Sequence, residues 1–588
     1  MHTKEYLFRD YATAGLLDLS FVTPRHPEPV EGAGSENKQC TMTPFDRLRV
    51  TLIMLLILLA QTINAQTVWE NTNSEVYNYL NRMSQKGLID FQDIIRPLSR
   101  QYIAEQLQEL EKKSTLLSNI EKNELGFYLQ EFKPIEGSDS DKIHLVKKDT
   151  NKRLRGLFIN TKDFQLNADP IGGLYYISGS GKSFTQMSNG IQFWGQSKHF
   201  GFQFYYRDYT ESGTGIDSFR KESPETGIIK LYNPSSKNQN FSEVRASISY
   251  SWNNGSISLG KDHLLWGYGE NGRIVLSNKA PTYPYIRFDY RPFKWMAFNY
   301  THAWLNSNIV DSNGTYNTGT TNTGTGDIRI QYIPKFMATH TLIFKPIKGL
   351  DIALGESIVY SDKIDIGFLI PVNFFKVYDN NRSNYNINAG SNGQFFLQVS
   401  SRNHLKKTHL YGSLFIDEIR VSEIFNSAKA RNQLGYTIGG SVTDAFISYL
   451  TIGGEYTRVN PFVYSNLLPA QFYTQYNDQL GDWMENNFDR AMLFAKFTPL
   501  PKLKTYIRYQ YIRKGGPGTI AQQYVAVPQP AFLFDYQKNR SDIFFQASYE
   551  LINNFYLTGS YQYINQELAS GTKLTNTTLQ VGISYGLK

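Results

Sequence analysis

Two glycine-rich stretches have the residue types and spacing of nucleotide-binding loops. Residues 267–272 read Gly-Tyr-Gly-Glu-Asn-Gly and fit the pattern G-x-G-x-x-G, in which glycines bring a pyrophosphate to a helix N-terminus. The next residues, 273–276, favour a strand and so provide no such helix. Residues 181–183 (Gly-Lys-Ser) resemble the end of a phosphate-binding P-loop, but Tyr176 stands where the first glycine is needed. We therefore predict flexible turns here and no cofactor.

The histidines show no spacing typical of catalysis or of metal binding. Two of the nine His precede residue 66, and none of the others lies in H-E-x-x-H or beside a Cys, so we expect no metal site. His199 and His404 fall in short polar turns. Only His263 and His302 keep open a hydrolase in which Ser, His and Asp converge. The pattern favours a protein that is not an enzyme.

A third set of residues suits the binding of sugars. An Arg guanidinium pairs with carboxylates or hydroxyls, and an aromatic face packs against the C–H groups of a sugar ring. Later in the chain, apolar and polar residues alternate. If the apolar ones face lipid, the polar residues of this set face the inside of a barrel and give it a net-basic interior. Singly, each of these residues could instead solvate its neighbours or a water-filled pore. The set is Gln203, Tyr205, Arg207, Arg287, Asp289, Asn299, Thr301, Lys504, Arg508 and Gln510.

From about residue 160 to the end, apolar residues recur with a period of two, as in long strands. No helical pattern interrupts this region. The connections alternate in length. Short turns fall at 197–199, 253–255, 291–294, 346–349, 404–406, 443–444, 500–501 and 553–554, and long polar loops at 210–241, 306–336, 361–393, 458–488 and 514–540.

This alternation of short and long connections is typical of an outer-membrane β-barrel, whose strands need about ten residues to cross and whose sheet must close. Eight short turns pair sixteen strands, and one further strand at each end (162–177 and 574–588) makes eighteen. A soluble sandwich or propeller would need glycine- and proline-rich turns at both edges or a repeated blade, and no repeat is found.

The composition supports an exported, strand-rich chain. Of 588 residues, 41% are hydrophobic, 19% are charged, 7 are Trp, 40 Tyr and 38 Phe, which excludes a disordered chain. One Cys excludes a disulfide scaffold. Arg47 and Arg49, the apolar run 51–60 and a small-residue site ending at Ala65 form the layout of a signal peptide. Without residues 1–65 the chain loses Cys40, six basic and seven acidic residues, and its net charge rises from +8 to +9.

The segment before the signal peptide has the character of a spurious extension. Residues 26–31 and 45–50 can be encoded by the two strands of one DNA palindrome, so we expect the true start at Met42 or a nearby codon.

Three amphipathic helices follow the signal peptide. Ser74 is the expected N-cap of the first, Ser99 of the second, and Ser118 with Glu121 forms a capping box for the third. The predicted fold is an all-β transmembrane β-barrel of about 18 antiparallel strands with a small N-terminal α-helical bundle. Its predicted parts are an extension plus signal peptide (1–65), a periplasmic helical bundle (66–135), a linker (136–159) and an outer-membrane barrel (160–588).

Two motifs resemble the Wzi-type capsule assembly proteins. Residues 260–269 (Gly-Lys-Asp-His-Leu-Leu-Trp-Gly-Tyr-Gly), followed by 274–281 and 285–289, are similar to the family's Trp-Gly-x-Gly region, and Arg96-Pro97-Leu98-Ser99 is similar to its N-terminal motif. Lys replaces Arg at 261. The resemblance implies an eighteen-stranded outer-membrane barrel with a periplasmic helical bundle.

The resemblance also implies a lectin-like function, in which the barrel binds capsular polysaccharide or exopolysaccharide and organises it at the cell surface. The alternative is a porin or transporter for anionic or sugar solutes. We expect a monomeric barrel in the outer-membrane lipid, with no nucleic-acid partner. The candidate polysaccharide-binding residues are Trp266, Tyr268, Glu270, Arg273, Arg287, Asp289, Arg207, Tyr205 and Arg508.

Overall fold

The structure is a computed structural model. It describes residues 67–132, 142–148, 154–216, 222–230, 237–319, 327–385, 390–426, 429–552 and 554–586. The predicted extension and signal peptide lie outside the described residues.

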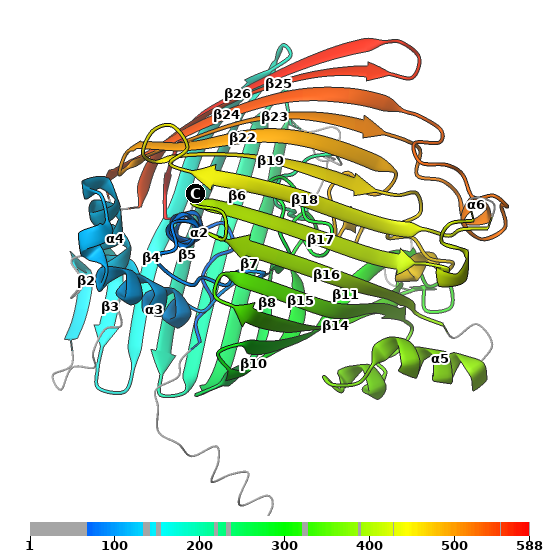
Figure 1. The fold of residues 1–588 in the computed structure, drawn as a ribbon, viewed down its shortest axis with the longest axis horizontal. Coiled ribbons are helices and arrows are strands. Elements are labelled where there is room, and N and C mark those ends of the chain that lie inside the picture. The colour runs from blue at the N-terminus through cyan, green and yellow to red at the C-terminus, as the bar shows by residue number, and fades with distance from the viewer. Residues whose placement is uncertain are drawn as a thin grey trace, which may run out of the picture. The chain divides into compact units, whose positions relative to one another are not determined.

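The described residues form a closed ring of eighteen antiparallel strands, which confirms the predicted barrel (Figure 1). The ring closes where the last strand pairs with the first, from Leu579 opposite Ser178 to Tyr585 opposite Gly172. In ring order the strands are β4 (Gln165–Gly179), β5 (Lys182–Ser197), β6 (Phe200–Gly213), β7 (Asn238–Trp252), β8 (Gly255–Asp262), β10 (Tyr283–Phe293), β11 (Met296–Val310), β14 (Tyr332–Ile347), β15 (Leu350–Ser361), β16 (Asn392–Arg402), β17 (Thr408–Glu418), β18 (Gln433–Thr443), β19 (Leu450–Val459), β22 (Phe488–Leu500), β23 (Leu503–Lys514), β24 (Lys538–Ile552), β25 (Phe555–Leu568) and β26 (Lys573–Tyr585).

Part of the predicted linker is a hairpin. β2 (Lys142–Lys148) and β3 (Leu154–Asn160) pair with each other, and β3 also pairs with the first residues of β4, from Leu157 opposite Ala168. Because β26 pairs with β4 only from Gly172 onward, the hairpin supplies the partner for the start of β4.

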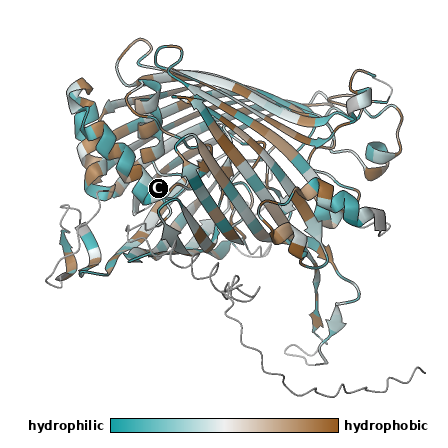
Figure 2. Cartoon of the chain, turned by 60° about the horizontal axis from the view of Figure 1, so that its bottom comes forward, coloured by the Kyte–Doolittle hydropathy of each residue, from teal (hydrophilic) through white to brown (hydrophobic). Residues whose placement is uncertain are grey.

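The two edges of the barrel differ as predicted. All eight predicted short turns join neighbouring strands at one edge, and the predicted long loops lie at the other. By the rule for outer-membrane barrels, the short-turn edge is periplasmic and the long-loop edge extracellular. Hydrophobic and hydrophilic residues alternate along the strands (Figure 2). Exposed apolar side chains such as Leu174, Ile248 and Leu493 face outward, while Asn299, Thr301 and Gln510 are buried inside.

Three helices pack together at the short-turn edge: α2 (Val76–Gln85), α3 (Arg100–Glu111) and α4 (Asn119–Phe132), with the short helix η1 (Ser114–Leu116) between the last two. The side chain of Ser99 caps α3, and Ser118 and Glu121 form the predicted capping box. Ser74 is not the N-cap of α2, because that helix begins one residue later, after Glu75. Among the described residues no helix is long and apolar enough to cross a membrane.

Two further helices lie in the long loops, where no helix was predicted: α5 (Phe375–Tyr385) and α6 (Ile520–Tyr524). The residues of α5 are mostly polar, and α6 has only five residues, so neither has the apolar periodicity that marks a helix in sequence. The remaining short elements are β12 (Tyr316–Asn317), β13 (Ile328–Arg329), β20 (Thr474–Gln475), β21 (Asp478–Gln479), η2 (Ile366–Leu369), η3 (Val421–Glu423) and η4 (Pro469–Gln471).

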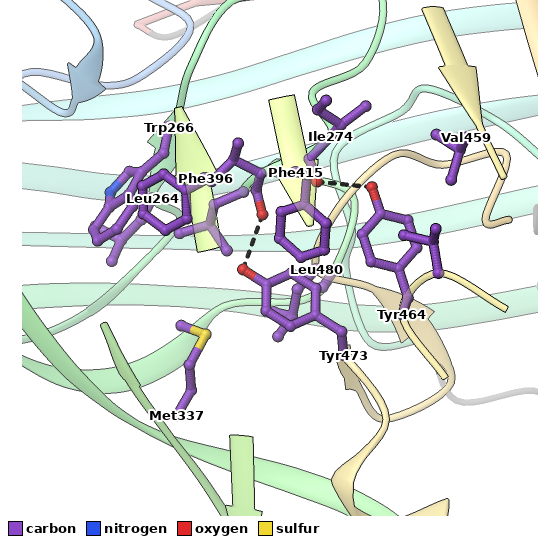
Figure 3. Packing of buried hydrophobic residues seen from close by; sticks show 14 of the residues in the cluster. Leu264, Trp266, Ile274, Met337, Phe396, Phe415, Val459, Tyr464, Tyr473 and Leu480 are labelled. Atoms are coloured by element: carbon purple, nitrogen blue, oxygen red, sulfur yellow. Dashed lines mark hydrogen bonds between the residues drawn. The ribbon is translucent and has the colours of Figure 1, made fainter. Parts of the chain in front are cut away.

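Two loops fill the inside of the barrel. Residues 263–282, between β8 and β10, and residues 460–487, between β19 and β22, contribute to a buried apolar cluster that also includes wall residues such as Phe396 and Phe415 (Figure 3). The Tyr464 hydroxyl donates a hydrogen bond to the Ile274 carbonyl at 2.7 Å, and the Tyr473 hydroxyl donates one to the Val275 carbonyl at 2.9 Å. We call these two loops together the plug.

Candidate functional site

The two sequence motifs meet inside the barrel. Residues 93–99 reach the plug from the helical bundle, and β1 (Ile95–Arg96) pairs with β9 (Leu265–Trp266) as a two-residue antiparallel ladder. Ile95 lies opposite Trp266, and the Gly267 N–H donates to the Ile94 carbonyl at 2.8 Å. Gly267 has a φ of +85°, a conformation that glycine adopts at no steric cost. The ladder ties the helical bundle to the plug.

A buried network of charges reinforces this junction. Asp93 accepts hydrogen bonds from Arg402 at 2.5 Å and from the Tyr268 hydroxyl at 2.9 Å, and it also pairs with Arg96. Burial alone would raise the pKa of the Asp93 carboxyl, but Arg402 and Arg96 together lower it well below its usual range. A carboxylate that stays charged at neutral pH therefore holds a wall strand and a plug residue together.

A cavity of about 720 Å³ lies between α2, the plug residues 268–273 and the wall strands β22–β24. Four predicted site residues line it: Tyr268, Glu270, Arg273 and Arg508. The Arg508 guanidinium donates to the Asn271 side chain at 2.6 Å, and Arg273 donates to the Gly267 carbonyl at 2.6 Å. Burial and the nearby Arg96 lower the pKa of Arg273 to about 10, although the carboxylates of Asp93 and Glu270 act in the opposite direction.

Sequence reasoning missed most of the residues that line this cavity, among them Lys496 and Tyr506. Lys496 pairs with Glu270 at 2.8 Å, although more than two hundred residues separate them. The period-two pattern places both of these side chains in wall strands, but no local signal distinguishes them from other strand residues. Only the position of the plug loop brings them to Glu270.

Trp266 lies outside the cavity. Its side chain is 1% exposed, packs against Phe396 with ring centroids 5.8 Å apart, and its indole N–H meets no hydrogen-bond acceptor among the described residues. A glycan could reach this ring only if the plug opened. The packing indicates a structural part for Trp266.

Arg287 and Asp289 form a second, separate group near the short-turn edge. Arg287 pairs with Asp289 through two hydrogen bonds of 2.7 and 3.0 Å, donates to the Pro97 carbonyl at 3.0 Å, and stacks on the Trp69 ring at 3.9 Å. They line a cavity of about 220 Å³. The Arg287 guanidinium is thus already occupied by its contacts with the N-terminal segment.

Tyr205 and Arg207 form a third group, on β6. The Tyr205 ring lies under the Arg245 guanidinium at 3.8 Å, at the side of a cavity of about 800 Å³ between the helical bundle and the wall. Arg207 points to a different neighbour and donates to the Ser188 hydroxyl at 2.7 Å. The nine predicted residues therefore do not form a single site.

His263 and His302, the two histidines that the sequence left open for catalysis, are hydrogen-bonded to groups other than a serine. His302 makes a 2.8 Å hydrogen bond with the Tyr360 hydroxyl, and His263 lies 3.2 Å from the Gly227 carbonyl. Burial lowers the pKa of His263, which favours the neutral ring. No group of three or more His, Cys, Asp or Glu in the described ranges could hold a metal ion.

Comparison with known proteins gives the family. The model of the family described as capsule assembly protein Wzi matches residues 192–577. The chain belongs to this family. The match runs from within β5 to within β26, and it includes the plug motif but not the helical bundle.

Solved structures agree with the fold. The outer-membrane protein Wzi of Escherichia coli superposes with a TM-score of 0.54 at 12% identity, over 89% of this chain and 100% of that one. OccD3 (OpdP) of Pseudomonas aeruginosa gives a TM-score of 0.41 at 12% identity, over 78% of this chain and 96% of that one. No curated protein sequence matches the chain. The Wzi family member described here is an outer-membrane barrel.

Proposed function

We propose that this Wzi family member binds capsular polysaccharide or exopolysaccharide and organises it at the cell surface, as a lectin of the outer membrane. The family match over residues 192–577 carries the proposal. The E. coli Wzi structure is described as a carbohydrate-binding β-barrel involved in group 1 capsule assembly, which supports the same role here. The proposal requires binding alone, with no chemical step and no cofactor.

Within the barrel, we take the 720 Å³ cavity as the candidate saccharide site. It combines aromatic faces, such as Tyr268 and Tyr506, with the guanidinium of Arg508, the pairing that suits sugar rings and their carboxylates. Its described lining has seven cationic side chains against four carboxylates, namely Arg82, Arg96, Arg273, Lys279, Lys496, Lys504 and Arg508 against Glu75, Glu124, Glu225 and Glu270. This balance favours an acidic saccharide.

The other predicted residues take supporting parts in this proposal. Trp266 packs the plug, Arg287 with Asp289 holds the N-terminal segment, and Tyr205 with Arg207 lies on a wall strand away from the cavity. The barrel acts as a monomer in the lipid of the outer membrane.

The filled interior argues against the porin alternative. In the described residues the two plug loops pack against the run of wall strands from β10 to β23 and form one apolar cluster with them. Free diffusion of solutes would require this cluster to come apart. We therefore expect little ion conductance in planar bilayers.

Deleting the gene tests the function in the cell. If the barrel organises the polysaccharide, the deletion releases polysaccharide into the medium while total synthesis continues. Unchanged cell-bound polysaccharide in the deletion strain would refute the proposal. Complementation with the intact gene is the matched control, because it restores retention only if the barrel itself is responsible.

A further inference from the structure

Part of the barrel's outer surface carries polar residues where a lipid-facing surface is expected. Thr301, Thr339 and Ser357 are opposite one another on β11, β14 and β15 and are buried inside the barrel. Their neighbours must therefore face outward, since side chains alternate along a strand. Those neighbours include His302, His340 and Glu356. Leu354, two residues before Glu356 on the same face, is 50% exposed, as a lipid-facing residue should be.

Glu356 is nevertheless only 2% exposed, because the loop after β15 folds back over the outside of the wall. The Glu356 carboxylate accepts hydrogen bonds from the backbone N–H groups of Phe375 at 2.9 Å and Lys376 at 2.5 Å, at the start of α5. The outward-facing Tyr300 hydroxyl donates to the Phe368 carbonyl at 2.8 Å. Figure 1 shows α5 outside the ring of strands. We call residues 362–385 the outer-wall segment.

Aromatic packing fixes the segment to the wall. Phe368 packs against Tyr360 with ring centroids 4.7 Å apart, and Phe375 against His340 at 4.5 Å. Both phenylalanines are fully buried in a cluster with Tyr300, Phe336 and Ile358. Within the segment, Asp365 accepts hydrogen bonds from the Tyr378 hydroxyl at 2.7 Å and from Arg382 at 2.8 Å. The segment therefore has a defined structure on the barrel's outer face.

The segment replaces the covered polar wall with an apolar surface of its own. Ile366 is 76% exposed and Val372 82% exposed, values far from those of residues that belong in a core. The other exposed apolar side chains of the segment are Ile364, Leu369, Ile370, Phe374 and Val377. The exposed Lys363 lies next to this surface in the chain. A cationic side chain beside exposed apolar groups is typical of a segment at a membrane interface.

We propose that the outer-wall segment docks in the outer leaflet of the membrane, with its apolar side chains among the acyl chains of the lipids. Continuity supports this occupant, because the segment lies on the face of the wall that carries lipid-facing Leu354. The wall's own polar residues explain why the segment is needed: without it Glu356 and His302 would meet hydrocarbon, where burying a polar group is unfavourable. The inference is independent of polysaccharide binding.

Site-directed fluorescence tests the proposal on the full chain. Cys40 is the only cysteine, so Cys40→Ser gives a background for single labels. Val372→Cys reports on the segment, Leu354→Cys on the lipid-facing wall, and Phe425→Cys, 98% exposed on the loop after β17, on water. Each protein carries an environment-sensitive dye and is reconstituted in phosphatidylcholine vesicles with or without nitroxide-labelled lipid. The shift in gel mobility on heating, a property of folded barrels, checks that each variant has folded.

The expected result is that nitroxide lipid quenches the label at 372 about as strongly as at 354 and several-fold more strongly than at 425. Quenching at 372 by iodide in water, with no response to nitroxide lipid, would overturn the proposal. Protection at 372 from both quenchers would also overturn it, and cross-linking between two 372 labels would identify a second copy as the occupant. Loss of polysaccharide binding has no bearing on these outcomes, so the two proposals fail separately.

Discussion

Ile95 and Trp266 lie directly opposite each other in the two-residue ladder that joins the helical bundle to the plug. Trp266 belongs to one of the two short motifs that resemble the Wzi family, and Ile95 directly precedes the other. Arg96 of that second motif lies opposite Leu265 in the same ladder, so motif residues that are far apart in the chain are in contact in the fold. This contact gives the motifs a structural role: together they form the joint, by which we mean the ladder that connects the helical bundle to the plug. Four of the candidate binding residues line a cavity beside it.

The joint should depend on the Asp93–Arg402 pair. Both side chains are almost fully buried, and removing one partner of a buried pair typically costs about 3–5 kcal/mol. Because Asp93 keeps its pair with Arg96, the lower end of that range applies here. We expect Arg402→Met to lower the free energy of unfolding by that order, measured by urea denaturation in detergent. Arg402→Met combined with Asp93→Leu should recover part of the loss. Lys112→Ala, which breaks an exposed pair with Glu109, should change little. Equal stability of Arg402→Met and the intact chain would show that the network is not needed.

Trp266→Ala should act on stability. The substitution empties a large volume in the packed plug, and such changes typically cost about 3–5 kcal/mol. Urea denaturation is again the measurement. Trp295→Ala, at a half-exposed site in the short turn between β10 and β11, is the matched control and should cost far less. A Trp266→Ala barrel of unchanged stability that fails to bind glycan would instead place the indole in the binding site.

Arg508→Gln should weaken saccharide binding. The change removes a cation from the cavity while keeping a side chain that can hydrogen-bond Asn271, and losing one charged hydrogen bond typically costs about 1.5 kcal/mol, or roughly tenfold in affinity. The dissociation constant for the polysaccharide measures the effect. Arg513→Gln changes an exposed arginine of the same strand and serves as the control. Similar affinities for both variants would move the binding site away from the cavity.

The contact between α2 and the turn after β18 should weaken in acid. Burial alone raises the pKa of Asp444, but Arg82, the Tyr449 N–H and Lys86 lower it to about 2. A carboxyl whose pKa is lower in the folded than in the unfolded state stabilises the fold at pH values above its unfolded pKa of about 4. This contribution disappears as the pH falls through the folded pKa of about 2. Unfolding free energies between about pH 5 and pH 2 should fall more steeply in the intact chain than in Asp444→Asn. Parallel curves would show that this pair contributes nothing.

The barrel could be predicted from sequence because each wall strand carries its own evidence. Alternation such as that of residues 579–585 and the short turns at one edge are local features, and they suffice for the strand number and the inward-facing set. The helix caps at Ser99 and Ser118 could also be predicted from the sequence, because a cap depends on residues close together in the chain.

The plug and the outer-wall segment could not be predicted from the sequence, because the residues that stabilise them are distant in the chain. Residue type alone suggests that Trp266 contacts glycan, but Ile95 lies opposite it and Phe396 packs against its ring. Glu356 looks like any polar strand residue until α5 covers it. The side of the wall that a residue faces follows from its alternation, whereas what covers that side depends on how the loops fold back.

Binding of polysaccharide by the purified full chain tests the central claim most directly. The measurement is calorimetric titration of the barrel in detergent with capsular or exopolysaccharide from the cell that makes it. We predict saturable binding that oligosaccharides of the same polymer compete for and that Arg508→Gln weakens. No binding by the folded barrel, together with open-pore conductance of the same preparation in a planar bilayer, would contradict the account and favour a porin.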